Sequence, residues 1–327
     1  LHLDKSPRED GMTSFFYQHF WNLIHRDLIS AVQSFFNSGM MLKYWNHTTI
    51  TLVPKCSSPS YLNQYRPISL CSVVYKILSM LATRLKNCLS YCISAYQSAF
   101  IQDRQLLDNM ISAQKVFHFP NKHRTRKNTS MALTLDLMKA FDRVEWICIE
   151  KIMIKMGFSL KFVKLLMVCI SSLSLCFCVN GSLTGIIYPT RGIWQGDPLS
   201  PYLFIIVTEL LITDAINGGV LSGIRLSRNC TTLSHMFFAD DALFFCKAEV
   251  GQAQAHMHLL ERYRLFTGQR VNLQKSSVLF RKNTQGFAQD SICSALNGIQ
   301  VHSSTRYMGL PLGIDKSKGG FLICDRI

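Results

Sequence analysis

The chain has 327 residues, of which 48% are hydrophobic and 17% are charged, and this composition excludes disorder over its whole length. Such a length corresponds to about two average domains, or to one large domain with several parts. The 35 Lys and Arg outnumber the 20 Asp and Glu, so the net charge of +15 favours a polyanionic partner, with nucleic acid ahead of an anionic membrane.

The spacing of apolar residues and the positions of turn residues predict the elements of the N-terminal part of the chain. In chain order, we expect a helix over 14–36, a strand over 47–54, a loop over 56–64, helices over 73–89 and 106–119, and a basic loop over 121–130. The run from Arg124 to Lys127 in this loop is either a contact to a nucleic-acid backbone or an ordinary solvated face.

The same signals continue through the rest of the chain. We expect a strand over 131–136, a helix over 145–156, a hairpin of strands 173–179 and 185–189 around Asn180-Gly181, a helix over 200–217, a hairpin over 235–246 and a helix over 250–267. Because helices are mixed with antiparallel hairpins, the predicted fold class is α+β.

Cysteine spacing indicates how the Cys residues are used, and segment length bears on whether the chain could span a membrane. The twelve Cys residues form no C-x-x-C pair, which favours thiols used as small core residues in a reducing compartment. The apolar segment 165–179 is shorter than the roughly twenty residues that a membrane span needs, so no membrane partner is expected. The chain begins with Leu and is expected to be a piece of a longer polypeptide.

Two adjacent carboxylates, Asp240 and Asp241, lie inside the apolar run 237–245, where a tight turn would join two buried strands. Two like charges side by side repel each other, and burial increases the cost. A divalent cation between them would relieve this repulsion, whereas the alternative is a polar turn in which Asp bonds nearby backbone.

A third carboxylate, Asp136, ends the apolar strand that begins at Met131. Taken alone, Asp136 is explained as a cap for the structure that follows. Together, the three carboxylates have the chemistry of a two-metal phosphoryl-transfer site, and hard oxygen ligands favour Mg²⁺ or Mn²⁺ over zinc.

A series of segments resembles, in order, the motifs of reverse transcriptases, above all those of plant LINE-type (non-LTR) retrotransposons. Leu135–Trp146 resembles the first catalytic motif, Arg191–Pro201 the second, and Phe238–Asp241 the third. Further resemblances are found at Leu52–Lys55, Tyr65–Leu70, Gln97–Ile101 with Arg104 and Asp108-Asn109, Gly268–Ser276 and Tyr307–Gly309.

The resemblance implies a right-hand polymerase fold, in which an antiparallel palm sheet is flanked by helices and most of the thumb is missing. The expected divisions are an N-terminal helical extension over 1–45, a fingers and palm region over 46–311, and the start of a truncated thumb or connection over 312–327. Within 46–311, the fingers are expected at about 46–130 and 150–190, and the palm at about 131–149 and 191–311.

The resemblance also implies roles for individual residues. Asp136, Asp240 and Asp241 would hold two Mg²⁺ ions, with Mn²⁺ as an alternative, and the backbone carbonyl of Leu137 would be a further ligand. The remaining expected roles are triphosphate contacts by Lys55 and Arg66, a nucleotide pocket lined by Gln195 and Gly196, a general acid at Lys275, and a primer grip formed by Tyr307, Met308 and Gly309.

Phe141 would exclude ribonucleotides by occupying the space of the 2′-hydroxyl, and its alternative reading is an ordinary core Phe. The other roles have equally plain alternatives. Lys55, Arg66 and Lys275 are explained as solvated surface, and Gly196 as part of a turn before the next helix.

The expected activity is RNA-directed DNA synthesis, with an RNA template, a DNA primer and dNTPs as partners. Three departures from the family pattern support an alternative, a decayed copy that only binds nucleic acid: Arg8-Glu9 within 7–11, Asp103 in place of Gly, and Trp194 in place of Arg or Lys. A polymerase that makes RNA conflicts with Phe141, and a maturase-like role needs a downstream RNA-binding region.

Overall fold

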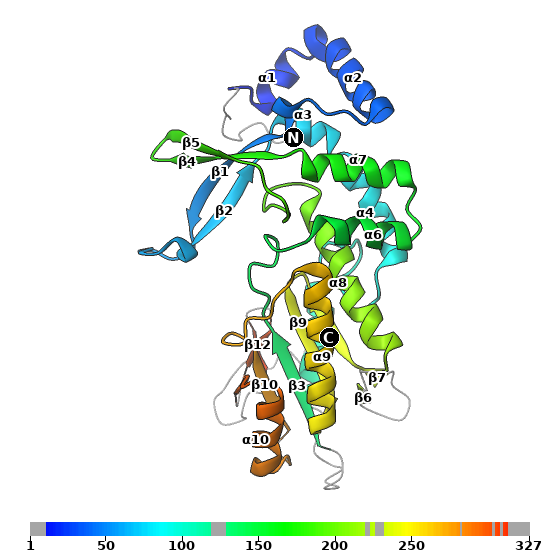
Figure 1. The fold of residues 1–327 in the computed structure, drawn as a ribbon, viewed down its shortest axis with the longest axis vertical. Coiled ribbons are helices and arrows are strands. Elements are labelled where there is room, and N and C mark those ends of the chain that lie inside the picture. Colours follow the sequence, from blue (N-terminus) through cyan, green and yellow to red (C-terminus); the bar gives the residue numbers. More distant parts are fainter. Residues whose placement is uncertain are drawn as a thin grey trace, which may run out of the picture. The chain divides into compact units, whose positions relative to one another are not determined.

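The computed structural model describes residues 11–118, 129–219, 223–225, 232–281, 283–302, 305–307 and 310–312 (Figure 1). Contacts divide the chain into two compact units, and each unit is made from two separate stretches. The first unit consists of Leu1–Cys92 and Phe141–Val207, and the second of Ile93–Ala140 and Thr208–Ile327. The predicted basic loop at Arg124–Lys127 lies outside the described residues.

A four-stranded sheet with the order β2-β1-β4-β5 forms one part of the first unit (Figure 1). Its strands are β1 (His47–Pro54), β2 (Tyr65–Leu70), β4 (Ser174–Val179) and β5 (Ser182–Ile187). Strand β1 pairs with β2 antiparallel and with β4 parallel. The hairpin predicted at Asn180-Gly181 is confirmed, with φ of 50° and 81° at these residues, but its second strand begins earlier than the predicted 185.

The helices of the first unit include two that the sequence predicted as single helices but that are divided in the structure. The helical elements are α1 (Ser14–His19), α2 (Trp21–Ser38), α3 (Val73–Leu78), α4 (Leu81–Cys92), α6 (Trp146–Lys155), α7 (Leu160–Ser171) and the 3₁₀ turns Lys43–Asn46 and Leu62–Gln64. The break between α1 and α2 is at Phe20, whose φ of −94° and ψ of 18° are not helical. The break after α3 is at Ser79, whose hydroxyl donates to the Lys76 carbonyl and competes with the helix pattern.

Helix α8 (Ser200–Asn217) carries the chain from the first unit into the second at Thr208. The prediction of this helix over 200–217 is confirmed. The helix predicted over 145–156 is also confirmed as α6, and Gly157, which follows it, has a φ of 89°. Glycine tolerates this left-handed conformation, so Gly157 ends the helix without strain.

The second unit is built on a five-stranded sheet with the order β11-β10-β3-β9-β8. Its strands are β3 (Ser130–Leu135), β8 (His235–Phe238), β9 (Asp241–Lys247), β10 (Ser277–Phe280) and β11 (Gln300–Val301). Strand β3 is central and pairs antiparallel with both β9 and β10. The predicted hairpin over 235–246 is confirmed, because β8 and β9 pair antiparallel around a two-residue turn.

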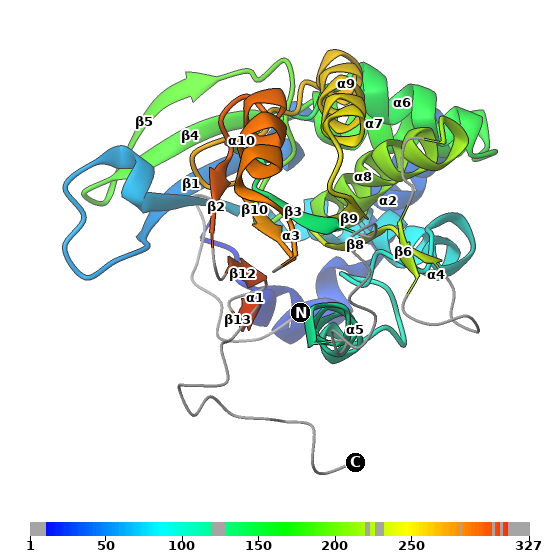
Figure 2. The same cartoon turned by 90° about the horizontal axis from the view of Figure 1, so that it is seen from below.

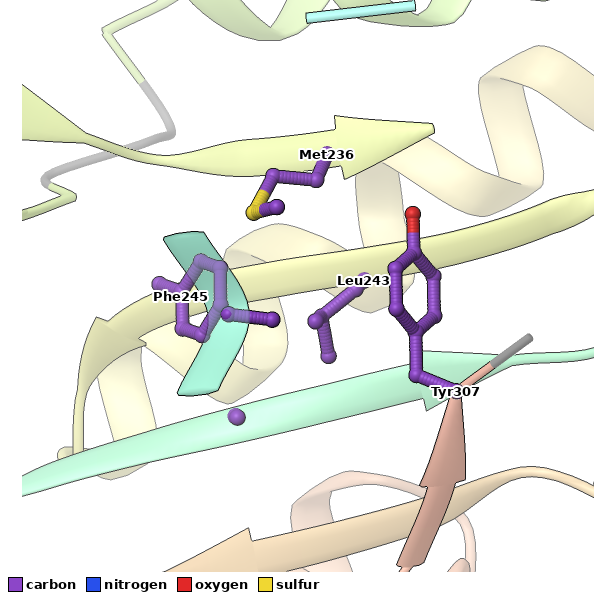
Figure 3. Packing of buried hydrophobic residues seen from close by; sticks show 6 residues of the cluster. Met236, Leu243, Phe245 and Tyr307 are labelled. Atoms are coloured by element: carbon purple, nitrogen blue, oxygen red, sulfur yellow. The ribbon is translucent and has the colours of Figure 1, made fainter. Parts of the chain in front are cut away.

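Helices cover both faces of this sheet (Figure 2). On one face lies α9 (Val250–Thr267), whose His256 ring contacts the Phe244 ring of β9 at 5.6 Å. On the other lies α5 (Leu106–His118), whose Ala113 belongs to a buried cluster with Ala132, Met236, Leu243, Phe245 and Tyr307 (Figure 3). Alternate residues of β9 therefore face opposite helices, as expected for a strand buried on both sides.

The remaining described elements of the second unit are small. They are α10 (Gly286–Ala295), the two-stranded pair β6 (Ile224–Arg225) and β7 (Thr232–Leu233), and the hairpin β12 (Thr305–Tyr307) and β13 (Leu310–Leu312). Among the residues that the structure describes, no helix is both long enough and apolar enough to pass through a lipid bilayer.

Candidate active site

The three carboxylates lie at the same end of neighbouring strands. Leu135, the last residue of β3, pairs with Ala242 of β9, so Asp136 and Asp241 occupy the next positions on adjacent strands. Phe238 pairs with Asp241 across the β8–β9 hairpin, which leaves Ala239 and Asp240 as its turn. The register of the sheet therefore gathers the carboxylates that the sequence predicted to act together.

The electrostatics show that these carboxylates interact. Loss of hydration, together with the negative charges of Asp240 and Asp136, raises the pKa of Asp241 to about 6. Burial also raises the pKa of Asp240, and Asp136 adds to this shift. Asp240 and Asp241 are both exposed to solvent, so the surrounding protein removes only part of their hydration.

A cation fits the chemistry of this group of acids. Three carboxylates that repel one another are oxygen donors of the type that bind Mg²⁺ or Mn²⁺, and a cation would cancel the repulsion that raises the pKa of Asp240 and Asp241. In the described ranges, however, no three His, Cys, Asp or Glu side chains are already closed around one ion position. The acids are gathered but would have to adjust around a metal.

The backbone of Asp136 is held by the turn that precedes β10. The Asp136 amide donates to the Ser276 hydroxyl at 3.2 Å, and the Asn272 amide donates to the Asp136 carbonyl at 2.8 Å. Leu137 forms an isolated antiparallel bridge with Val271. Lys275 belongs to the same turn and its side chain is exposed, so the predicted general acid lies on a segment that is bonded to Asp136.

Phe141 lies in the first unit and is half-buried rather than a core residue. Its ring stacks on Phe204 of α8, with centroids 4.8 Å apart and an angle of 10° between the rings. Its carbonyl accepts a hydrogen bond from the Ile193 amide at 2.9 Å. The stacked partner holds the ring in place, and the residue remains partly exposed.

Gln195 and Gly196 form a loop that is bonded to β2. The Ser69 amide donates to the Gln195 carbonyl at 2.7 Å. Gly196 has a φ of 104°, and a Cβ at this position would lie 2.5 Å from the Ser69 carbonyl oxygen. Both the backbone angle and the close approach require glycine here.

Asp197, to which the sequence assigned no role, anchors this loop from inside the protein. Its buried carboxylate accepts hydrogen bonds from the Leu199 amide at 3.1 Å, the Ser200 hydroxyl at 2.9 Å and the Tyr75 hydroxyl at 3.2 Å. Burial raises the pKa of Asp197, while these hydrogen bonds oppose the shift. The bond from the Leu199 amide, two residues further along the chain, is the local contact by which Asp stabilises a turn.

The two predicted triphosphate ligands lie on exposed parts of the β1–β2 hairpin. Arg66 pairs with Val53 in the β1–β2 register, and its side chain is exposed. The Lys55 ammonium donates to the Asn63 carbonyl at 2.8 Å, which closes the loop that joins the two strands. Arg66 is therefore on a regular strand, whereas Lys55 has a local structural partner.

Tyr307 lies in the core rather than on an open surface. It is only 2% exposed, and its ring packs beside Leu243 on one face of the second-unit sheet (Figure 3). Burial raises the pKa of its hydroxyl well above its ordinary value. Met308 and Gly309 lie outside the described residues, so of the predicted primer grip only Tyr307 has a described position.

The structure accounts for two of the departures from the family pattern. Asp103 has a φ of 63°, the left-handed conformation that glycine adopts most easily, so the usual Gly at this position is explained. Trp194 packs against the buried cluster of Ile50, Leu173 and Leu175. Its ring thus fills space in the first unit.

Comparison with known proteins places the chain in a family. Residues 53–312 match the family described as reverse transcriptase (RNA-dependent DNA polymerase). This match covers well over half of the chain, and the chain belongs to that family. Reverse transcriptases use divalent metal ions, in agreement with a carboxylate-rich site.

Two relatives come from transposable elements. The chain is 28% identical over 316 residues to the transposon TX1 uncharacterized 149 kDa protein of Xenopus laevis, covering 96% of this chain and 23% of the relative. It is 27% identical over 200 residues to the retrovirus-related Pol polyprotein from type-2 retrotransposable element R2DM of Drosophila melanogaster, covering 61% of this chain and 18% of the relative. The chain thus spans about a quarter or less of the length of these proteins.

Solved structures give the fold. Apo telomerase from Candida tropicalis, truncated from its C-terminal domain, superposes with a TM-score of 0.58 at 12% identity, covering 91% of this chain and 59% of that one. The predicted right-hand polymerase fold of the α+β class is confirmed, as is the resemblance to reverse transcriptases of non-LTR retrotransposons. A plant origin stays a prediction.

Proposed function

We propose that this chain is the catalytic part of an RNA-directed DNA polymerase, in which a primer 3′-hydroxyl attacks the α-phosphate of a dNTP paired with an RNA template. The observation that carries this proposal is the gathering of Asp136, Asp240 and Asp241 at one end of β3 and β9, within a chain of the reverse transcriptase family. The family's description makes RNA the template, and the net charge of +15 suits both nucleic-acid strands.

The carboxylates of Asp136, Asp240 and Asp241, with the Leu137 carbonyl, would hold two Mg²⁺ ions, for which Mn²⁺ is an alternative. Bound divalent cations lower the pKa of an attacking hydroxyl and neutralise charge that builds up on the phosphates. The raised pKa of Asp241 supports this assignment, because a group of acids that repel one another gains from a shared counter-charge.

The other residues keep the roles that the resemblance implies. Arg66 and Lys55 would contact the triphosphate, Gln195 and Gly196 would line the nucleotide pocket, and Lys275 would protonate the pyrophosphate that leaves. The Tyr307–Gly309 hairpin would hold the primer end, with Tyr307 acting as its anchor in the core. The assignment of fingers at about 46–130 and 150–190, and of palm at about 131–149 and 191–311, is part of the same proposal.

Primer extension on an RNA template with Mg²⁺ tests the proposal. The full chain should add dNTPs, and Asp240→Ala should abolish addition. Asp290→Ala, which removes an exposed acid from α10 in the same unit, is the matched control and should keep the activity. A folded chain that adds no nucleotide would overturn the proposal.

The departures at Asp103 and Trp194 favour a second candidate, a remnant that binds nucleic acid without polymerising. For such a protein, RNA binding should weaken steeply with salt. The Lys and Arg side chains release counterions from the phosphates when they bind, and added salt opposes this release. Asp240→Ala should then leave RNA binding unchanged or strengthen it, with no nucleotide addition by either protein. Since Asp103 and Trp194 both fit the fold, we favour the polymerase.

A further inference from the structure

Gln97 is a fully buried polar residue that contacts the turn between β8 and β9. Its side chain is 0% exposed, and its Oε1 accepts hydrogen bonds from the Ala99 amide at 3.1 Å and from the Ala239 amide at 3.2 Å. The Gln97 Nε2 donates to the Thr208 hydroxyl at 3.4 Å. Ala239 is the first residue of the turn whose second residue is Asp240.

The turn needs such support because Ala239 has a φ of 51°. This left-handed conformation is unfavourable for residues with a Cβ, and a second residue must therefore stabilise it. A turn that relaxed to a more ordinary conformation would re-orient the peptide between Ala239 and Asp240. The positions of Asp240 and Asp241 thus depend on contacts made by Ala239.

The backbone around Gln97 is itself docked on β8. The Phe237 amide donates to the Tyr96 carbonyl at 2.8 Å, and the Ser98 amide donates to the Phe237 carbonyl at 3.2 Å. These bonds form a short parallel bridge between Gln97 and Phe237. The backbone at Gln97 is therefore held beside β8, within reach of the turn for its side chain.

Arg104 holds the backbone of this segment through hydrogen bonds to its carbonyls. Its guanidinium donates to the carbonyls of Ser94 at 2.5 Å, Gln97 at 2.6 Å and Ile93 at 3.0 Å. One planar cation that bonds three carbonyls of a single loop restricts the loop to one shape. The three hydrogen bonds from Arg104 therefore hold the backbone of the loop that carries Gln97.

We propose that Gln97 is a positioning residue for the polymerase reaction: its amide oxygen holds Ala239 in the left-handed conformation and thereby sets the orientation of Asp240 and Asp241. Arg104 acts one step further back by fixing the backbone of Gln97. The catalytic part of this inference rests on the proposed function, whereas the holding of the turn does not.

The test compares two variants of the full chain. Gln97→Met has a similar size but only a weak thioether acceptor, and Gln97→Glu keeps an acceptor oxygen for the amides of Ala99 and Ala239. Hydrogen exchange of the Ala239 amide should be at least about ten times faster in Q97M than in the wild type, and within about threefold of the wild type in Q97E. Nucleotide addition by Q97M should fall about 10- to 100-fold in kcat with little change in KM for dNTP, since small misplacements of catalytic groups act on the chemical step.

Asn109→Ala is the matched control, because the buried Asn109 amide donates its hydrogen bond to the Phe237 carbonyl in the strand rather than to the turn. Its Ala239 exchange should match that of the wild type. Equal Ala239 exchange in Q97M and the wild type would overturn the proposal. Should Q97M fail to fold, a folded Q97E with an unprotected Ala239 amide would overturn it as well.

The two proposals can fail separately. If the wild type adds no dNTP but Q97M still loses protection at Ala239, the proposed polymerase activity is wrong and the holding of the turn is right. If the wild type is active and Q97M keeps both its kcat and its protection, the role of Gln97 is wrong and the polymerase stands.

Discussion

Leu135 on β3 and Ala242 on β9 pair directly across the antiparallel ladder, and this pairing determines which side chains meet at the end of the two strands. It places Asp136 next to Asp241, and the short β8–β9 turn adds Asp240. A shift of one residue in the register would turn Asp241 to the other face of the sheet. The geometry of the site is therefore fixed by the packing of apolar residues.

The repulsion between the carboxylates predicts a change in stability when one is neutralised. A carboxyl whose pKa is raised in the folded state destabilises that state once the pH exceeds its unfolded value, so at pH 7.5 without metal the charge on Asp241 is unfavourable. Asp241→Asn should then raise the free energy of unfolding by about 1 kcal/mol after allowance for solvent screening. Urea denaturation measures the change, and dNTP addition by the same variant should fall by about 100-fold or more.

Divalent cations should stabilise the wild-type protein. Mg²⁺ should raise the melting temperature of the wild type, because it binds the folded state and relieves the repulsion. Its effect on Asp241→Asn should be clearly smaller, and chelation with EDTA should reverse it in both proteins. An equal rise for the two proteins would show that the cation binds elsewhere.

His235 predicts a loss of stability in mild acid. Burial lowers its pKa to about 4, so between pH 6.5 and 4 the unfolded chain binds a proton that the folded chain does not. The contribution of His235 to stability is therefore full above pH 6.5 and is lost as the pH falls to 4, by up to about 3 kcal/mol for a shift of this size. Urea denaturation at a series of pH values measures the slope.

His235→Phe should reduce that slope, since the new ring can occupy the place of an imidazole that already contacts Tyr96, Phe237 and Phe244. Part of the slope should persist, because burial also lowers the pKa of His256. His258→Phe, at an exposed position, is the control and should leave the slope unchanged. The same slope in H235F and the wild type would contradict the assignment.

Gly196→Ala should destabilise the first unit and weaken dNTP use. The added Cβ would lie 2.5 Å from the Ser69 carbonyl and would also face a φ of 104°, which together should cost about 2–4 kcal/mol. Gly181→Ala is the matched control, with a φ of 81° but no atom within 4 Å of the new Cβ, and should cost only about 1 kcal/mol. Equal losses in urea denaturation would show that the contact with Ser69 is not restrictive.

Phe141→Ala should relax the choice of sugar. Removing the ring should lower discrimination between dNTP and rNTP by about tenfold or more, measured as a ratio of kcat/KM values. It should also lower the free energy of unfolding by about 2 kcal/mol, because the stack with Phe204 is lost. Phe204→Leu breaks the same stack but leaves Phe141 in place, and should affect stability more than sugar choice. Unchanged discrimination in F141A would make Phe141 an ordinary packing residue.

The sequence predicted the β3 strand and the β8–β9 hairpin well, because two acids inside a Phe-rich run leave few alternatives to a turn between buried strands. It did not predict the division at Phe20, since the apolar spacing continues across a single non-helical residue. Strand β2 was recognised only as a motif, because Pro67 within it argues against a strand except at a sheet edge, which is where β2 lies.

The carboxylates of the site were predicted from their chemical type, whereas the residues that position them were not. Gln97 stood in a recognised motif, yet its contact with Ala239 spans 142 residues of chain. Neither the burial of a polar side chain nor the left-handed conformation of an Ala leaves a local signal in sequence. The buried carboxylate of Asp197 was missed because its partner Tyr75 lies 122 residues away.

Both units are assembled from two stretches of chain, with Phe141–Val207 of the first interrupting the second. A single crossover between two related genes would consequently cut at least one unit in two. Exchange of a whole unit between such genes needs three breakpoints, near Cys92, Ala140 and Val207. We therefore expect chimaeras joined at all three of these points to fold far more often than those joined at one.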